Sequence, residues 1–266
     1  MRISLIITTY NWKEALERSL HSVLAQTLLP LEVLVADDGS GPDTGDLVRA
    51  VAQTAPIPVI HSWQEDRGFR SARSRNLAIA RAQGDYLILI DGDILLEPHF
   101  IADHRAFARP RYFVQGTRAL LGPERSAQVL AGGPLGFGLF TPGVENRKNC
   151  LRSVWLARLF SLPSRRLAGI KTCNFAFWRQ DAWRVNGFNE DFVGWGREDS
   201  EFAARLINSG LRRRDLKFHG LGYHLHHPIQ TRDRLAINDA LLQATITEKR
   251  SRCERGLDLH LAPQGL

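Results

Sequence analysis

The sequence has few cysteines and no long apolar run. Its three cysteines, Cys150, Cys173 and Cys253, are an odd number at wide spacing in a chain of 266 residues. This pattern argues against a disulfide framework and against a cysteine zinc site, and it fits a reducing compartment. No apolar stretch reaches the roughly 18 residues that a membrane-spanning helix needs. The apolar run after Met1 is also too short for a signal peptide, so we expect a cytoplasmic protein.

Acidic residues are outnumbered by basic ones. The chain has 28 Asp and Glu against 35 Lys and Arg, a net charge of +7. This excess favours an anionic partner, which could be nucleic acid, a membrane surface or a phosphate-bearing substrate. Hydrophobic residues make up 44% of the chain, which is enough for a core and excludes disorder as the dominant state. The length fits one α/β domain with an extended C-terminal part.

Short apolar runs alternate with amphipathic segments in the first 110 residues. The pattern predicts strands at 3–7, 31–36, 59–62 and 86–90, and helices at 12–24, 43–54 and 71–82. Such alternation implies an α/β fold with a parallel sheet covered by helices on both faces. After about residue 110 the pattern is irregular, with a glycine-rich loop at 131–143 and helices expected at 200–208 and from about 231 to 250.

Polar clusters follow three of the predicted strands. They are Thr8 to Asn11, Asp37 to Ser40, and Asp91 to Asp93. In open α/β sheets, ligands bind outside the carboxyl ends of the strands, so we expect the three clusters to line one crevice. Each cluster alone also fits a turn or a helix cap. Their joint placement is the informative feature.

The pair Asp91 and Asp93 flanks Gly92 directly after a buried strand. Side chains two positions apart in an extended segment point the same way. Two carboxylates on one side suit a hard cation such as Mg²⁺ or Mn²⁺, especially when a substrate diphosphate completes the shell. The alternative is an ordinary Asp-Gly turn.

Further candidates lie in the second half of the chain. Glu198 and Asp199 follow Gly194-Trp195-Gly196. They are either first-turn acids favoured by the helix dipole, or a general base beside a tryptophan that stacks on a sugar. The histidines at positions 224, 226 and 227 are dense enough to complete a metal shell begun by carboxylates.

Two basic segments have two interpretations each. The residues Arg73, Arg75 and Asn76 either form a solvated helix face or hold a diphosphate. The stretch 147–166 is an exposed helix with an apolar inner face, or a helix lying on an anionic membrane with Trp155 and Phe160 toward lipid.

These motifs together resemble a known family. The segments Thr8-Thr9-Tyr10-Asn11, Asp37-Asp38-Gly39-Ser40, Arg75-Asn76 and Asp91-Gly92-Asp93 resemble the N-terminal half of glycosyltransferase family 2, whose members have the Rossmann-like GT-A fold. The segments Asn174 to Phe177, Gly187-Phe188-Asn189-Glu190 and Gly194-Trp195-Gly196-Arg197-Glu198-Asp199 resemble the C-terminal motif of β-1,4-galactosyltransferases, polypeptide N-acetylgalactosaminyltransferases and bacterial chondroitin polymerase. The resemblance covers roughly residues 1–110 and 168–228.

The resemblance implies a nucleotide-binding role for five of the candidates. Thr8, Tyr10 and Asp38 would lie around the uracil and ribose of a UDP-sugar. Asp66 and Arg73 would lie near the nucleotide or its diphosphate.

It also implies the metal-binding residues. Asp91 would contact the ribose and Asp93 a divalent metal, Mn²⁺ or Mg²⁺, with His224 completing the shell. His226 and His227 are second choices for that position.

The C-terminal motif implies the catalytic pair Glu198 and Asp199. Glu198, like Trp195, would bind sugar, and Asp199 matches the base that deprotonates the acceptor. Family members often have two glycines before this pair, and here Arg197 replaces the second.

The resemblance therefore implies an inverting, metal-dependent glycosyltransferase that uses a UDP-sugar and a saccharide or glycolipid acceptor, in bacterial surface polysaccharide or lipopolysaccharide synthesis. We expect a nucleotide-sugar-binding half at 1–110, an acceptor-binding and catalytic half at 111–230 of the same domain, and a helical tail at 231–266. A peripheral contact with the inner face of the membrane through 147–166 is part of this expectation. The alternatives are a sugar nucleotidyltransferase and a basic nucleic-acid-binding protein; no standard nucleic-acid motif is visible, so we expect no nucleic-acid partner.

Overall fold

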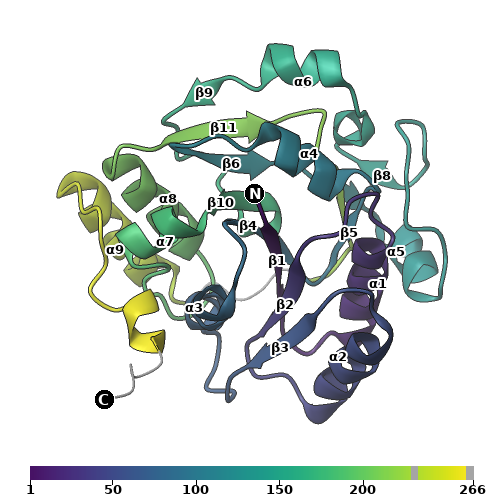
Figure 1. The fold of residues 1–266 in the computed structure, drawn as a ribbon, viewed down its shortest axis with the longest axis horizontal. Helices are drawn as coiled ribbons and strands as arrows, with labels where there is room; N and C mark the ends of the chain where they lie inside the picture. Colours follow the sequence, from purple (N-terminus) through teal and green to yellow (C-terminus); the bar gives the residue numbers. More distant parts are fainter. Residues whose placement is uncertain (229–232, 262–266) are drawn as a thin grey trace.

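The computed structural model describes residues 1–228 and 233–261, and its centre is a large sheet with helices on both faces (Figure 1). Across the sheet, the eight strands follow in the order β3 (Val59–Trp63), β2 (Glu32–Asp37), β1 (Ile3–Thr9), β4 (Tyr86–Asp91), β10 (Phe175–Trp178), β6 (Tyr112–Gly116), β11 (Arg212–Leu216) and β9 (Pro163–Ser164). Strands β1 to β4 are parallel to one another, and β10 and β9 run against their neighbours. The predicted α/β class and mostly parallel sheet are confirmed.

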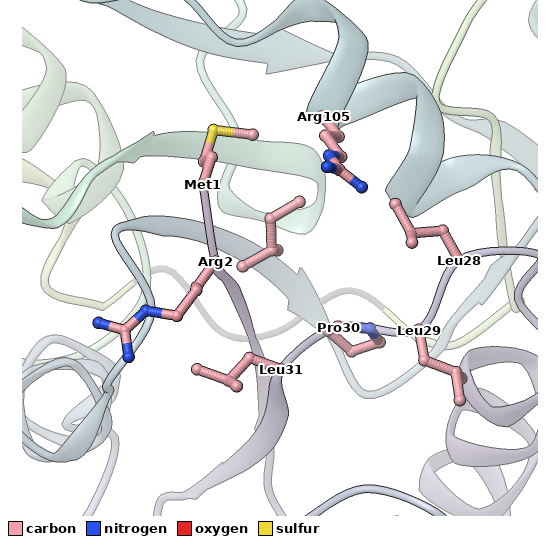
Figure 2. A pocket seen from close by; sticks show the side chains of 8 residues that line it. Met1, Arg2, Leu28, Leu29, Pro30, Leu31 and Arg105 are labelled. Carbon is pink, nitrogen blue, oxygen red and sulfur yellow. The ribbon is translucent and has the colours of Figure 1, made fainter.

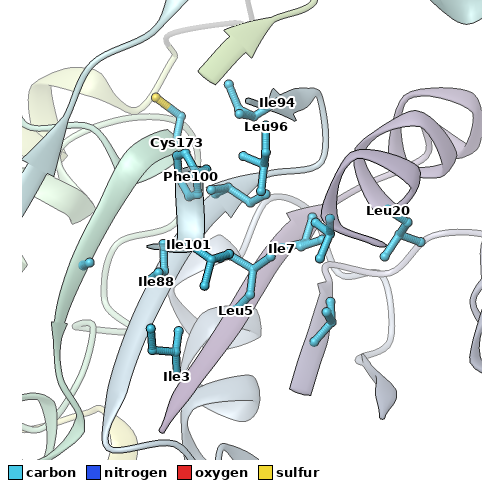
Figure 3. Close-up of a cluster of buried hydrophobic side chains, with 14 of the residues drawn as sticks. Ile3, Leu5, Ile7, Leu20, Ile88, Ile94, Leu96, Phe100, Ile101 and Cys173 are labelled. Carbon is cyan, nitrogen blue, oxygen red and sulfur yellow. The ribbon is translucent and has the colours of Figure 1, made fainter. Parts of the chain in front are cut away.

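The helices form two layers because successive residues of the central strands point to opposite faces. Leu5 and Ile7 of β1 pack on one side, and Ile6 packs on the other. The first layer consists of α1 (Lys13–Leu24), α2 (Pro42–Thr54) and α4 (Phe100–Phe107), and Figure 3 shows part of its core. The second layer consists of α3 (Ser71–Arg81), α7 (Arg179–Val185) and α8 (Glu198–Asn208).

A second, smaller sheet was not predicted. Its strands are β5 (Ile94–Leu96), β12 (Gly222–His224), β7 (Ala119–Leu121) and β8 (Val144–Glu145), in that order. In the antiparallel pairing of β12 with β5, His224 lies opposite Ile94. This pairing places a histidine from the end of the domain beside the acidic turn that follows β4.

The basic stretch 147–166 was predicted as one helix, and this prediction is wrong. It contains a 3₁₀ turn at Arg147–Cys150, the short helix α6 (Val154–Phe160) and the edge strand β9. Ser153 caps α6 by accepting a bond from the Leu156 amide at 3.4 Å, and the helix ends shortly before Pro163, which disfavours helical geometry in the residue before it.

The remaining elements complete the second half of the chain. They are α5 (Pro123–Leu130), a 3₁₀ turn at Thr172–Asn174, α9 (Leu235–Thr247) and a 3₁₀ turn at Leu257–His260. Residues 131–143 contain no helix or strand, as predicted. The expected tail helix from about 231 to 250 is observed as α9, which packs against α8; positions 231 and 232 lie outside the described residues.

Candidate functional site

The carboxyl ends of β1, β2 and β4 open into one cleft of about 1640 Å³. Residues from all three polar clusters line it, so the predicted single crevice is confirmed. The lining includes these candidates from the sequence: Thr8, Tyr10, Asp38, Asp91, Asp93, Trp195, Glu198, Asp199 and His224.

Two predicted nucleotide residues, Asp66 and Arg73, do not line the cleft and contact residues at its edge instead. Asp66 accepts a hydrogen bond from the Tyr10 hydroxyl at 3.0 Å. Arg73 donates to Gln64 at 2.6 Å, and Gln64 in turn donates to Asp38 at 2.5 Å. The structure therefore places Asp66 and Arg73 behind Tyr10 and Asp38.

The adjacent acids Asp37 and Asp38 have different environments. Asp37 is fully buried and accepts a hydrogen bond from the Ser40 amide at 2.8 Å, and it lies 2.8 Å from His61 Nε2. Burial works against its charge, but these contacts hold the pKa of Asp37 below its usual value. At Asp38, burial raises the pKa to about 6. The hydrogen bond that the Arg70 amide donates at 2.7 Å lowers this pKa, but by less than burial raises it. Asp37 thus fixes the turn, while Asp38 faces the cleft.

Among the residues that the structure describes, one cluster could hold a metal ion: Asp93, His224 and His227. The Nε2 atoms of the two histidines lie 3.5 Å and 3.3 Å from Asp93 Oδ2, and all three ligand atoms lie within 4.8 Å of one another. The other oxygen, Asp93 Oδ1, is buried and has no hydrogen-bond partner among the described residues. By sequence His227 ranks behind His224 as a metal ligand, but both lie at Asp93. His226 also lines the cleft, but it is exposed and outside the cluster.

The pKa values of Asp93 and His224 are consistent with a bound cation. Burial, together with the charge of Asp91, raises the pKa of Asp93 to about 8. Burial, together with the charge of Arg118, lowers the pKa of His224 to about 3. His224 is therefore neutral and offers a lone pair, and a cation would compensate the desolvated carboxylate of Asp93.

Cations surround the acids of the cleft. Arg75 of α3 lies 3.0 Å from Glu198 and 3.8 Å from Asp91, and it donates to the Thr8 hydroxyl at 3.3 Å. Its guanidinium is almost fully buried, so it links β1, β4 and α8 at the base of the cleft. By sequence Arg75 is a candidate phosphate contact; in the structure it joins Glu198 and Asp91 to one another.

Arg118 and Lys171 also line the cleft, and neither was predicted from the sequence as a site residue. Arg118 precedes β7 and donates to the Cys173 sulfur at 3.0 Å. Its Nε is buried without a partner among the described residues. Neither residue stands in a motif: Arg118 reaches the cleft through the small sheet, and Lys171 is held there by Gln115 of β6, which accepts from the Lys171 amide at 2.9 Å.

The acids at the start of α8 differ in their contacts. Glu198 accepts from Arg75 through Oε1, and its Oε2 is buried with no partner among the residues that the structure describes. Asp199 is half-buried, and its Oδ1 accepts from the Ser200 amide at 2.6 Å. Burial, and next the charge of Glu198, raises the pKa of Asp199 to about 7. Such a carboxylate can accept a proton near neutral pH.

The loop that carries Trp195 is held from the C-terminal helix. Asn238 of α9 donates to the Gly196 carbonyl at 2.9 Å. Arg197 lies in the left-handed region at φ 78° and pairs with Asp239 of α9 at 2.5 Å. The residue that departs from the family motif therefore connects the loop to α9, at a backbone angle that favours glycine.

Substitutions of Arg197 separate the contribution of its ion pair with Asp239 from the cost of its left-handed backbone angle. A residue with a side chain in the left-handed region costs about 1 kcal/mol relative to glycine, and an exposed ion pair contributes about 0.2–1 kcal/mol. Arg197→Gly removes both terms, so its free energy of unfolding should stay near that of the parent. Arg197→Ala loses only the pair and should be less stable than Arg197→Gly by about 1 kcal/mol. Urea unfolding of both variants measures this, and equal stabilities would contradict the backbone argument.

A second hollow, of about 220 Å³, lies at the amino end of β1 (Figure 2). Its lining is mostly apolar, with Arg2 and Arg105 as the charged residues. It has no acid, histidine or hydroxyl group and so offers no general base or metal ligand.

The large, mostly parallel sheet between two layers of helices, with the acids Asp91 and Asp93 at the carboxyl end of β4, has the layout of a GT-A fold. The family model described as "Glycosyl transferase family 2" matches residues 4–141. A second model, described as "N-terminal domain of galactosyltransferase", matches residues 158–228. The chain belongs to glycosyltransferase family 2.

Curated relatives agree with this assignment. The chain is 31% identical over 234 residues to validoxylamine A glucosyltransferase of Streptomyces hygroscopicus subsp. limoneus. This match covers 79% of this chain and 48% of the relative. It is 26% identical over 249 residues to chondroitin synthase of Escherichia coli, covering 85% of this chain and 35% of the relative. The chain thus spans about half or less of the length of these relatives.

Solved structures share the fold. TarS 1–349 of S. aureus in complex with UDP-GlcNAc matches with a TM-score of 0.66 at 16% identity, over 98% of this chain and 69% of that one. GalNAc-T7 with UDP, GalNAc and Mn²⁺ matches with a TM-score of 0.62 at 15% identity, over 85% of this chain and 43% of that one. Within the part of the chain that the structure describes, no helix has the length and apolar character needed to cross a membrane.

Proposed function

We propose that this protein is a metal-dependent, inverting glycosyltransferase that moves a sugar from a UDP-sugar to a hydroxyl group of a saccharide or glycolipid acceptor, in bacterial surface polysaccharide or lipopolysaccharide synthesis. The observation that carries the proposal is the cleft, where Asp93 and its histidines, Glu198 and Asp199 line one space of about 1640 Å³. A divalent ion, Mn²⁺ or Mg²⁺, and a UDP-sugar are proposed because a structural neighbour was crystallised with UDP, GalNAc and Mn²⁺, and another with UDP-GlcNAc. A saccharide acceptor is proposed from the relationship to chondroitin synthase.

The donor is proposed to lie along the carboxyl ends of β1, β2 and β4. Tyr10 and Asp38 would contact the nucleoside, with Asp66 and Arg73 orienting them from behind. Asp91 would bind the ribose hydroxyls, which its position at the cleft allows.

The diphosphate is proposed to lie near Asp93. Asp93, His224 and His227 would hold the divalent ion, which supplies positive charge that stabilises the diphosphate as a leaving group. Arg118 and Lys171 line the same cleft and would add cationic contacts to the phosphate oxygens.

Asp199 is proposed as the general base. It takes the proton of the acceptor hydroxyl while that oxygen attacks the anomeric carbon on the side opposite the diphosphate. The bond between the anomeric carbon and the diphosphate oxygen breaks, and UDP leaves. A single displacement inverts the configuration, so an α-linked donor gives a β-glycoside.

The sugar is proposed to contact Trp195 and Glu198. An aromatic ring offers an apolar face to a sugar. The unpartnered Oε2 of Glu198 can accept from a sugar hydroxyl while Oε1 stays bound to Arg75. The peripheral membrane contact through 147–166 belongs to the same proposal, and the exposed side chains around α6 support it.

A panel of UDP-sugars with Mn²⁺ tests this function by slow release of UDP, with and without saccharide acceptors. We expect release with at least one UDP-sugar and faster release with an acceptor. Release of diphosphate from UTP and a sugar phosphate would instead identify a sugar nucleotidyltransferase. A salt-dependent shift of DNA or RNA, with no UDP release, would identify a nucleic-acid-binding protein.

A further inference from the structure

The helix α6 presents its large side chains to solvent. Trp155 is 79% exposed and Leu159 is 65% exposed, and Leu162 just beyond the helix is 66% exposed. Only Ala157 of the helix is buried. Large apolar side chains that protrude together from one short element indicate a contact surface.

This element lies at the edge of the large sheet farthest from β3 (Figure 1). Strand β9, which follows α6, is the edge strand and pairs with β11. The apolar surface is therefore at the rim of the molecule, where no other described element covers it.

The segment of sequence that contains α6 has basic residues and no acidic ones. Residues 146–180 contain no Asp or Glu and eight basic residues: Arg147, Lys148, Arg152, Arg158, Arg165, Arg166, Lys171 and Arg179. These sum to +8, whereas the whole chain is +7, so the rest of the chain sums to 7 − 8 = −1. The basic character of the protein is thus concentrated in these 35 residues.

Part of this charge lies around α6, whereas Lys171 lines the cleft and Arg179 donates to the Ala82 carbonyl at 3.1 Å. Arg152 pairs with Asp103 at 2.6 Å. Among the described residues, no carboxylate pairs with Arg158, Arg165 or Arg166, and all three are exposed. The Arg158 guanidinium lies 5.8 Å from the centre of the Trp155 ring, so a cation and an aromatic ring stand side by side.

The combination fits an anionic membrane surface. Tryptophan and leucine insert into the headgroup region, and arginine remains near the lipid phosphates. A specific protein partner usually covers about 800 Å² of each surface with complementary packing. A few protruding side chains on a seven-residue helix offer no such flat area, whereas a fluid lipid surface adapts to them.

We propose that α6 and the chain from Leu162 to Arg166, here called the α6 surface, bind an anionic membrane through Trp155, Leu159 and Leu162. The same stretch continues directly to Leu167 and Lys171, which line the cleft. The α6 surface therefore holds the cleft mouth close to the lipid. If the proposed transfer reaction holds, this position favours an acceptor carried on a lipid.

Co-sedimentation of the full chain with vesicles tests the α6 surface without any substrate. We expect binding to phosphatidylcholine vesicles that contain phosphatidylglycerol, little binding to pure phosphatidylcholine, and weaker binding at high salt. Arg165→Gln with Arg166→Gln should weaken binding about 30-fold, at the contribution expected per basic residue. Trp155→Ala with Leu159→Ala should weaken it about tenfold or more.

Matched controls change the same kinds of residue elsewhere. Arg49→Gln with Arg81→Gln makes the same change in net charge on α2 and α3, beside β3 at the opposite edge of the sheet. Leu259→Ala with Leu261→Ala removes two exposed apolar side chains, 56% and 57% exposed, near the C-terminal end. Both controls should bind vesicles like the parent.

Three outcomes overturn the proposal. They are no binding to anionic vesicles at low salt, equal loss of binding in the controls, and capture by an acidic protein in place of vesicles. Slow UDP release in solution is measured in parallel, and we expect it to be unchanged in the Trp155 and Arg165 variants. Vesicle binding without UDP release from any UDP-sugar would reject the proposed function and leave the α6 surface standing.

Discussion

Asp199→Asn is expected to lower the rate of sugar transfer by about 10²- to 10⁴-fold while UDP still binds. The asparagine keeps an oxygen that can accept from the Ser200 amide, which Asp199 binds at 2.6 Å. It cannot accept the proton of an acceptor hydroxyl. Transfer measured by UDP release in the presence of an acceptor, and UDP affinity measured by calorimetry, separate the two properties.

The control for this variant is the neighbouring substitution Ser200→Ala. It removes the weaker hydroxyl bond to Asp199, at 3.2 Å, and leaves the backbone bond in place. We expect its transfer rate to stay within a few-fold of the parent. An Asp199→Asn variant as active as Ser200→Ala would remove Asp199 from the role of base.

The pH dependence gives an independent measure of the same group. Burial and the charge of Glu198 raise the pKa of Asp199 to about 7. A base acts only when it is deprotonated, so kcat/KM should fall about tenfold for each pH unit below about 7. The Asp199→Asn variant should lack this limb of the profile.

The first half of the fold could be predicted from local pattern. The run Ile3 to Ile7 and the run Tyr86 to Ile90 are apolar and short, and both are buried strands at the centre of the sheet. Predicting these two runs as buried strands needs no long-range information, because polar residues bound each run. The alternation with helices then implies that the strands are parallel, and with it the shared edge where Asp38, Asp91 and Asp93 meet.

The second half could not be predicted in the same way. Strand β10 enters the sheet between β4 and β6 and runs antiparallel to both, although β4 and β6 are its distant neighbours in sequence. Phe113 and Phe175 come together only through this arrangement, with ring centres 5.3 Å apart. Strands of three to five residues carry too little periodicity to fix such a long-range order.

The same limit applies to the candidate site. The motif resemblance indicated His224 as a metal ligand. Only the pairing of β12 with β5 and β7 brings His224 close to Asp93. His227 reaches Asp93 from a segment without helix or strand, and Arg118 enters the cleft because it precedes β7. No spacing in the sequence relates these three residues, so their meeting is a property of the small sheet.

Asp93→Ala is expected to abolish the Mn²⁺-dependent part of UDP binding, with a loss of about 100-fold or more in affinity. Residues that only support a metal ligand typically change metal affinity by about 10–100-fold, and Asp93 is proposed as a ligand itself. Calorimetry with UDP, with Mn²⁺ and again with EDTA, measures this part directly. The variant should keep its thermal stability, because the buried carboxylate it removes has an oxygen without a partner among the described residues and a pKa raised to about 8. A loss of binding is then not a loss of folding.

The three histidines supply the matched series. His224→Ala and His227→Ala should each weaken Mn²⁺-dependent UDP binding, since both Nε2 atoms lie within 3.5 Å of Asp93 Oδ2. His226→Ala makes the same chemical change at an exposed position that lines the cleft but lies outside the cluster, and it should leave the Mn²⁺-dependent part of binding as it is. Unchanged binding in Asp93→Ala, or equal effects of all three histidine variants, would remove the metal site from Asp93. A decrease confined to Asp93, His224 and His227 would assign the ion to the junction of the two sheets, because β12 supplies His224 and the turn between β4 and β5 supplies Asp93.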